Sequence, residues 1–219
     1  MELAVFREYL PAYARAALAT LGIAALGIVL ATAVGLVTAV VQYAQVPVAR
    51  RVAAVYVELS RNTPLVVQLF FLYYGLPKVG LVWGSGTCAV VGLGFLGGSY
   101  MAEAFRSGLD AVEPAQTQSA LALGFGPALA LRHVVAPQAV ALATPAFTAN
   151  VIFLIKETSV VSIVAYPDLV YVAKDYIGTD YNTAEALFLL VVFYLLIVLP
   201  VSLGAAALER RVRRAGFGA

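Results

Sequence analysis

The chain has 219 residues, of which 62% are hydrophobic and only 12% are charged, and its mean hydropathy is +0.91. Soluble domains are about 45–50% apolar and about 25% charged, so this composition excludes a soluble globular protein and predicts an integral membrane protein. The formal net charge of +2 gives no indication of a nucleic-acid partner. The single cysteine, Cys88, excludes an internal disulfide bond, and we expect it to be a buried, unreactive thiol.

Five apolar tracts are long enough to cross a bilayer as helices, which takes roughly 20 residues each. The predicted spans are residues 12–43, 52–75, 87–108, 138–165 and 183–207. The sequence lacks the ten-residue segments of alternating polarity that a membrane barrel needs, so we expect an all-α fold in a single domain over residues 1–219. No cleavable leader is predicted, because the first apolar tract is too long for a signal-peptide core.

Basic residues are distributed unevenly between the two sides of this predicted bundle. One side carries eight arginines: Arg50, Arg51, Arg106, Arg132, Arg210, Arg211, Arg213 and Arg214. The other side carries Lys78 and Lys174, with Asp168, Asp175 and Asp180 close by. Positively charged loops remain in the cytoplasm, so the C-terminus is predicted to be cytoplasmic. An odd number of spans then places the N-terminus outside.

The segment between the third and fourth spans, Ala115–Ala139, is too polar to cross the membrane but keeps leucines near helical spacing. Gly124, Gly126 and Pro127 interrupt this pattern, because glycine loosens a helix and proline removes a hydrogen-bond donor. The sequence therefore predicts a pair of short cytoplasmic helices joined by a bend. The alternative is an amphipathic helix that lies passively among the lipid headgroups.

Ionisable side chains in or near spans are costly and mark candidate functional sites. Glu58 and Arg61, and likewise Glu103 and Arg106, are three residues apart, a spacing at which each pair can neutralise itself on one helix face. Arg61 is followed by Asn62, Thr63, Pro64 and Gln68. A proline in a span frees backbone carbonyls, and polar neighbours can then line a cavity. A binding role and a structural role both remain open for Arg61.

The tetrad Lys156–Ser159 (Lys-Glu-Thr-Ser) interrupts the apolar run of the fourth span. Discontinuous helices near the membrane midplane are where transporters bind charged groups. The alternative is that Lys156 extends along the helix to the outer interface. Small residues at Gly27, Ala31 and Gly35 predict close helix packing on the first span, either within the subunit or at a dimer interface.

Enzyme chemistry is not predicted from these residues. The three lysines follow Pro77, Ile155 and Ala173, so the Gly-Lys pair of a phosphate-binding loop is missing from the sequence. One histidine, one cysteine and no clustered carboxylates supply neither a nucleophile–base pair nor a metal site.

Four stretches resemble, in order and spacing, the permeases of ATP-binding-cassette (ABC) importers in the polar amino acid branch. They are Glu58–Pro77 (ELSRNTPLVVQLFFLYYGLP), Ser99–Pro114 (SYMAEAFRSGLDAVEP), Ala120–Ala139 (ALALGFGPALALRHVVAPQA) and Asn150–Ile163 (NVIFLIKETSVVSI). The resemblance implies a multi-pass permease subunit of the cell inner membrane that moves polar amino acids by alternating access. It also implies two cytoplasmic ATPase subunits that bind ATP and magnesium, a second permease subunit, identical or different, and an external solute-binding protein.

The resemblance further implies that the bent helix pair contacts the ATPase. The residues expected to couple to the ATPase are Gln118, Ser119, Ala120, Gly124 and Pro137. The family has Glu-Ala-Ala where this chain has Gln118-Ser119-Ala120, so the first side chain can exchange hydrogen bonds but cannot form a salt bridge. Such a change suits a heterodimer whose second permease keeps the glutamate.

An amino acid substrate requires a cation for its carboxylate and an acceptor for its ammonium group. Arg61 or Lys156 could supply the cation. The candidate polar partners are Thr63, Asn150, Glu157, Thr158 and Ser159. The alternative function is an ion-gradient-driven transporter or channel, which would need buried carboxylates free of neighbouring arginines, whereas Glu58 and Glu103 each have one nearby.

Overall fold

The computed structural model describes residues 3–43 and 46–217, and these residues form helices and short connections without a strand. The all-α prediction is confirmed. The α-helices are α1 (Leu3–Tyr43), α2 (Pro47–Arg61), α3 (Leu65–Phe70), α4 (Ser85–Asp110), α5 (Pro114–Ala122), α6 (Pro127–Ala130), α7 (Ala136–Glu157), α8 (Leu169–Thr179) and α9 (Thr183–Phe217). Shorter π or 3₁₀ segments are η1 (Phe71–Gly75), η2 (Leu76–Val79), η3 (Leu131–Val135) and η4 (Thr158–Val164).

Four stretches of helix are long and apolar enough to cross a membrane: Val5–Tyr43, Ser85–Asp110, Pro127–Val164 and Thr183–Val212. They match four of the five predicted spans. The remaining prediction, one helix over residues 52–75, is wrong, because α2 ends at Arg61 and α3 begins at Leu65. Pro64 immediately precedes α3, and proline disfavours helical backbone in the residue before it. A fifth crossing by α2 and α3 together remains a prediction.

The break between α2 and α3 is hydrogen-bonded rather than loose. The buried Gln68 amide donates to the carbonyls of Ser60 at 3.1 Å and Thr63 at 3.0 Å. The Thr63 hydroxyl donates to the Leu59 carbonyl at 2.8 Å, and the Asn62 amide donates to the Glu58 carbonyl at 2.8 Å. These side chains satisfy the carbonyls that a helix end leaves without partners, so the two helices meet at a defined angle.

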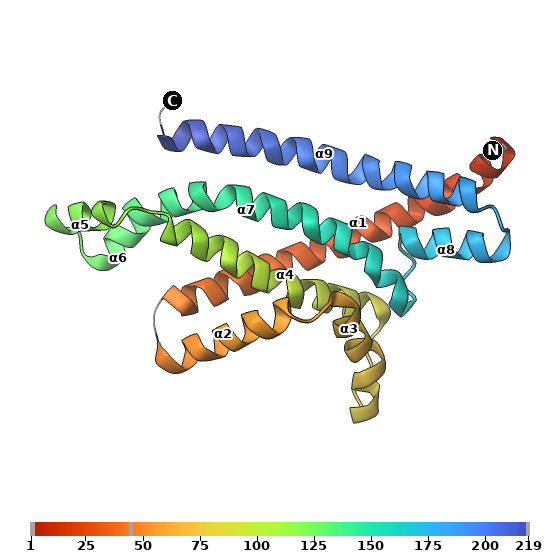
Figure 1. Cartoon of the computed structure of the whole chain (residues 1–219), viewed down its shortest axis with the longest axis horizontal. Helices are drawn as coiled ribbons and strands as arrows, with labels where there is room; N and C mark the ends of the chain where they lie inside the picture. The colour runs from red at the N-terminus through yellow and green to blue at the C-terminus, as the bar shows by residue number, and fades with distance from the viewer. Residues whose placement is uncertain (1–2, 44–45, 218–219) are drawn as a thin grey trace.

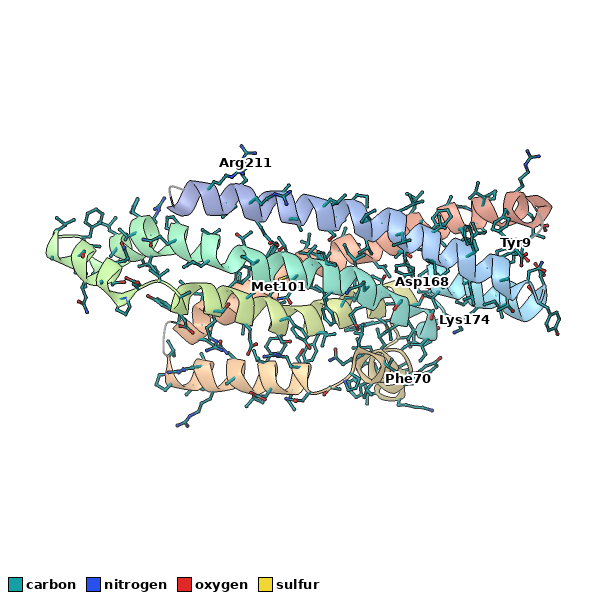
Figure 2. All side chains as sticks on the ribbon, turned by 45° about the horizontal axis from the view of Figure 1, so that its top comes forward. Tyr9, Phe70, Met101, Asp168, Lys174 and Arg211 are labelled. Carbon is teal, nitrogen blue, oxygen red and sulfur yellow. The ribbon has the colours of Figure 1, made fainter. Side chains whose placement is uncertain are left out.

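Figure 1 shows that the chain ends lie at opposite ends of an elongated bundle. The N-terminus and α8 are at one end, and the C-terminus, α5, α6 and the start of α2 are at the other. Figure 2 shows the same separation in side chains, with Arg211 near one end and Lys174, Asp168 and Tyr9 towards the other. The arginine-bearing segments named from the sequence are therefore gathered at the end that carries α5 and α6.

Helices α1 and α4 pack closely along a seam of small residues. A Cβ atom added at Gly35 would lie 2.8 Å from the backbone nitrogen of Ala102 and 2.9 Å from the carbonyl oxygen of Gly98. One added at Gly27 would lie 2.9 Å from Cβ of Leu93. Ala31, which is fully buried, faces Gly97 in the same seam. Of the two alternatives for this small-residue pattern, the structure shows packing within the subunit.

This close packing predicts that alanine substitutions at two glycines of α1 will change the stability of the protein by different amounts. Gly35→Ala is expected to destabilise the protein by about 1–3 kcal/mol, because the new methyl group meets backbone atoms that cannot move aside. Gly22→Ala is the matched control, since nothing lies within 4 Å of a Cβ atom added there. Thermal unfolding of the purified variants in detergent should show a lower midpoint for Gly35→Ala alone. Equal midpoints would contradict the close approach of α1 and α4.

At the opposite end from α5 and α6, α8 is held against α1 and α9. The Asp168 carboxylate caps α8 by accepting from the Tyr171 backbone at 2.8 Å, and the Leu169 backbone donates to the Thr20 hydroxyl at 3.2 Å. Asp168 is fully buried, and this burial raises its pKa to about 7. Tyr9 donates to Asp180 at 2.7 Å, which fixes the N-terminal part of α1 to the end of α8.

Candidate functional site

The predicted bend in the cytoplasmic segment is a glycine-terminated helix end. Helix α5 begins with Pro114 at its first position and ends in a Schellman motif, in which Phe125 donates to the Ala120 carbonyl at 3.1 Å and Gly124 donates to the Leu121 carbonyl at 3.0 Å. Gly124 has a φ of +87°, a left-handed conformation that a residue with a Cβ atom adopts only with strain. The pair of short helices joined by a bend is therefore confirmed.

The surface of this bend exposes more apolar side chains than a protein surface that contacts only water usually does. The exposed apolar side chains are Leu121, Leu123, Phe125 and Leu129, and Leu123 is 79% exposed. Gln118 and Ser119 are also exposed, whereas Ala120 is buried. Leu121, Leu123 and Phe125 lie outside the four helices that can cross a membrane, and contiguous apolar side chains in such a segment are typical of a protein contact surface. Gln118 and Ser119 are available to that contact, and Ala120 anchors the helix to the bundle.

The second short helix is continuous with a membrane span. The stretch Pro127–Val164 runs through α6, η3, α7 and η4 without a break, so the helix begins eleven residues before the predicted start of the span at residue 138. Pro137 lies two residues after the π-turn η3. Proline supplies no backbone donor, and a π-turn is one of the adjustments that accommodates this loss. Pro137 therefore lies inside the continuous helix rather than at the bend.

Arg61 belongs to a cluster that joins three helices. Its guanidinium forms an ion pair with Glu103 of α4 and lies 5.1 Å from the centre of the Tyr100 ring, a cation–π contact. Asn150 of α7 donates to the Tyr100 carbonyl at 3.0 Å. The Arg61 and Glu103 side chains are 37% and 36% exposed, so the pair is accessible from one side. We call Arg61, Tyr100, Glu103 and Asn150 the Arg61 cluster.

The predicted local pair of Glu58 with Arg61 is wrong. Among the described residues, the Glu58 carboxylate has the Asn62 amide as its only partner, at 3.1 Å, and Arg61 turns to α4. The predicted pair of Glu103 with Arg106 is confirmed, with 3.9 Å between the charged atoms. Glu103 thus faces two arginines, one from α2 and one from its own helix.

The Lys-Glu-Thr-Ser tetrad lies elsewhere on the fourth span. It is placed where α7 changes to the 3₁₀ segment η4, so the helical hydrogen-bond pattern changes at the tetrad although the helix continues. Lys156 and Ser159 line an apolar groove of about 440 Å³ against Tyr194 and other residues of α9. Glu157 is half-buried, and Thr158 is fully buried and donates to the Ile155 carbonyl at 2.7 Å.

The seven predicted pathway residues therefore fall into two groups rather than one. Arg61, Thr63 and Asn150 are near α2 and α4, whereas the tetrad faces α9 or the interior. Asn150 and Lys156 are six residues apart on one helix, which corresponds to about 9 Å along its axis and about 240° around it.

Within the described residues, no group of three or more His, Cys, Asp or Glu side chains is placed to hold a metal ion.

Sequence reasoning missed Tyr100 as part of this site, and it named Gln68 only as a polar residue that follows Arg61. Tyr100 contributes its ring to Arg61 and its carbonyl to Asn150, and Gln68 closes the break next to Arg61. The signal for Gln68 was its position four residues after Pro64, where an amide can reach back to free carbonyls. No local pattern indicated Tyr100, because its partners come from two other helices.

Comparison with known proteins places these features in a family. Residues 31–214 match the family described as "Binding-protein-dependent transport system inner membrane component". The probable amino-acid ABC transporter permease protein y4tG of Sinorhizobium fredii is 32% identical over 92% of this chain and 87% of its own length. The probable glutamine ABC transporter permease protein GlnP of Bacillus subtilis is 32% identical over 89% of this chain and 90% of its own.

A solved structure agrees with the sequence relatives. A chain from the crystal structure of an amino acid ABC transporter with histidines superimposes with a TM-score of 0.91 at 30% identity, covering 96% of this chain and 99% of that one. The chain therefore belongs to the family of binding-protein-dependent transport system inner membrane components and is a multi-pass permease of the ABC class.

Proposed function

We propose that this chain is the membrane-spanning subunit of an ABC importer for polar amino acids. The observation that carries the proposal is the exposed, apolar bend of α5 and α6 at the arginine-rich end of the bundle. The names of the relatives support the cargo, since y4tG and GlnP are described as amino-acid and glutamine permeases. The sequence has no Gly-Lys pair for a phosphate-binding loop, so an ATP-driven mechanism needs ATP and magnesium on other subunits.

The bend is the proposed contact with the ATPase subunits, of which the complete transporter would have two. Gln118, Ser119 and the exposed leucines would line the contact, with Gly124 fixing its shape. The gathering of arginines at this end supports a cytoplasmic C-terminus and an N-terminus outside. A second permease subunit, identical or different, would complete the pathway, and an external solute-binding protein would deliver the amino acid to the end that carries α8.

Cargo recognition is proposed at the Arg61 cluster, with the tetrad as a second contact. The accessible guanidinium of Arg61 can bind a substrate carboxylate while Glu103 and Tyr100 hold it in position. Lys156 and Ser159, in their groove against α9, would meet the substrate only after a rearrangement of α7 or α9. Alternating access would expose the Arg61 cluster to one side of the membrane and then to the other.

The experiment that tests this function is uptake by the complex purified from membranes and reconstituted in liposomes. Radiolabelled polar amino acids should accumulate when ATP is present on the ATPase side and the matching solute-binding protein on the other. Accumulation should persist with an uncoupler and stop without ATP. Uptake that needs no ATP and disappears with the uncoupler would instead establish the alternative, an ion-gradient-driven transporter.

A further inference from the structure

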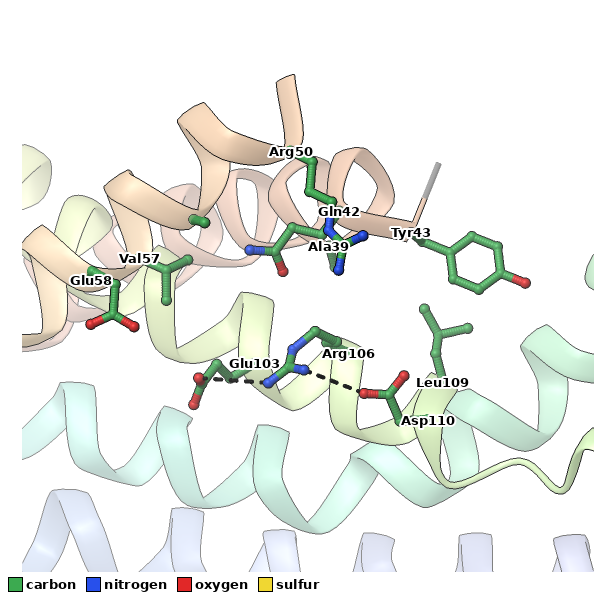
Figure 3. A pocket seen from close by; sticks show the side chains of 11 residues that line it. Ala39, Gln42, Tyr43, Arg50, Val57, Glu58, Glu103, Arg106, Leu109 and Asp110 are labelled. Atoms are coloured by element: carbon green, nitrogen blue, oxygen red, sulfur yellow. Dashed lines mark hydrogen bonds and ion pairs between the residues drawn. The ribbon is translucent and has the colours of Figure 1, made fainter. Parts of the chain in front are cut away.

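A polar cavity of about 520 Å³ lies between the last turn of α1, the face of α2 from Arg50 to Glu58 and the end of α4 (Figure 3). Its ionisable and amide side chains are Gln42, Arg50, Glu58, Glu103, Arg106 and Asp110. The volume is within the range of small-ligand sites. The cavity is at the same end of the bundle as α5 and α6, where the sequence predicts the membrane–cytoplasm interface.

The charges in this cavity are incompletely paired. Glu103 pairs with Arg61 and also, at 3.9 Å, with Arg106, and the other charged residues of the cavity are Arg50, Glu58 and Asp110. Arg106 approaches Asp110 at 3.5 Å, a long separation for an ion pair. In the part of the chain that the structure describes, the Arg50 side chain has no hydrogen-bond or ion-pair partner. Arg50 and Glu58 therefore have no ion-pair partner among the described residues, and Arg106 and Asp110 are held only by long contacts.

An apolar groove of about 220 Å³ adjoins the polar cavity. The two share Ala39, Tyr43 and Leu109, so they are direct neighbours. From these shared residues the groove extends along α1, past Phe105 of α4, to Val140 of α7, and almost all of its lining is apolar. A site with a charged compartment at the interface and an apolar groove directed into the membrane matches a molecule with a charged headgroup and a hydrocarbon chain.

We propose that this site binds a phospholipid with a zwitterionic, primary-amine headgroup, namely a phosphatidylethanolamine. The phosphate faces Arg50 and Arg106, the ammonium group faces Glu58 and Asp110, and one acyl chain occupies the groove. Two cations and two carboxylates balance a headgroup that carries one charge of each sign. The ammonium N–H groups can donate to carboxylates, which the methylated amine of phosphatidylcholine cannot do.

Binding at this position places a lipid against the segment that follows the bend. The groove includes Leu131 of η3 and Ala136 at the start of α7. A bound acyl chain would thus fill the space between α1 and the base of the long fourth span. The proposal concerns a ligand of this chain and does not depend on which substrate the transporter carries.

The test is native mass spectrometry of the complex purified in detergent and titrated with dioleoyl phosphatidylethanolamine, phosphatidylcholine or phosphatidylglycerol. Phosphatidylethanolamine should be retained at one molecule per permease chain, with about tenfold weaker retention of phosphatidylcholine, since charged hydrogen bonds are lost. Arg50→Gln should weaken phosphatidylethanolamine retention about tenfold for the same reason. Arg51→Gln should not, because Arg51 is exposed and does not line the cavity.

Two further variants separate the headgroup from the chain. Glu58→Gln should remove the preference for phosphatidylethanolamine over phosphatidylcholine, and Val140→Trp should block the groove and weaken retention of both. Val37→Trp, an equally exposed position of α1 outside the groove, is the control for added bulk. Unchanged thermal midpoints would show that the variants are folded.

Three results would overturn the proposal. They are equal retention of phosphatidylethanolamine and phosphatidylcholine, preferential retention of phosphatidylglycerol, and displacement of phosphatidylethanolamine by a free amino acid. Because the readout is bound lipid rather than uptake, it is independent of the uptake experiment. A complex that imports no amino acid could still retain the lipid, and the reverse is equally possible.

Discussion

Gly124→Ser is expected to lower ATP-driven uptake about tenfold, while Gly126→Ser leaves uptake unchanged. At position 124 the serine must adopt a φ of +87°, which costs an L-residue about 1–2 kcal/mol and favours opening of the Schellman motif. At position 126 the glycine is the N-cap of α6 with φ −70° and ψ 159°, a conformation and a role that suit serine. Nothing lies within 4 Å of a Cβ atom at either position, so only the backbone conformation differs.

Uptake into liposomes and co-purification of the ATPase subunits are the two measurements for this pair. If the bend shapes the ATPase contact, Gly124→Ser should lose both together, with an unchanged amount of permease in the membrane. Equal uptake by the two serine variants would show that the shape of the bend is unimportant for coupling. Loss of the permease itself would instead assign Gly124 to folding.

Arg61→Glu is expected to impair assembly and to reduce uptake by about 10- to 100-fold. The double variant Arg61→Glu with Glu103→Arg, in which the two charges are exchanged, should restore assembly but not uptake. The single change places two carboxylates together and removes the cation proposed to bind the substrate carboxylate; charged hydrogen bonds of this kind contribute about 1.5–3 kcal/mol. The double variant re-creates an ion pair between α2 and α4, but it moves the positive charge to another helix.

The thermal midpoint and uptake of both variants distinguish a structural from a substrate-binding role. A midpoint near that of the unaltered protein, together with uptake that stays low, is the expected result for the double variant. Full recovery of uptake would show that Arg61 serves only to join α2 to α4. Arg61→Lys is a useful third variant, because it keeps the charge but loses the planar group that lies against Tyr100.

Features that depend on local sequence could be predicted well. The bend at Gly124 follows from glycine and proline spacing, and the change from α-helix to 3₁₀ helix within Lys156–Ser159 coincides with a polar tetrad inside an apolar run. The small residues of α1 predicted close packing, although not that α4 would be the helix they pack against. In each case the physical cause lies within a few residues of the feature.

Features that depend on distant residues could not be predicted. The expected pair of Glu58 with Arg61 rested on helical spacing, but α2 ends at Arg61, and its guanidinium finds a carboxylate 42 positions later in the chain. Tyr100 joins Arg61 to Asn150 through contacts that only the packing of α2, α4 and α7 creates. A single sequence does not contain the relative positions of helices, which explains why seven candidates separated into two groups.

The unbroken course of residues 127–164 has a mechanical consequence for any movement that begins at α6. From Pro127 to Lys156 the helix rises about 44 Å, at about 1.5 Å per residue. A tilt of about 6° about the α6 end would displace Lys156 sideways by about 5 Å, more than the length of a hydrogen bond. A small rotation at the α6 end of the helix is therefore sufficient to rearrange the polar contacts around Lys156 at the other end.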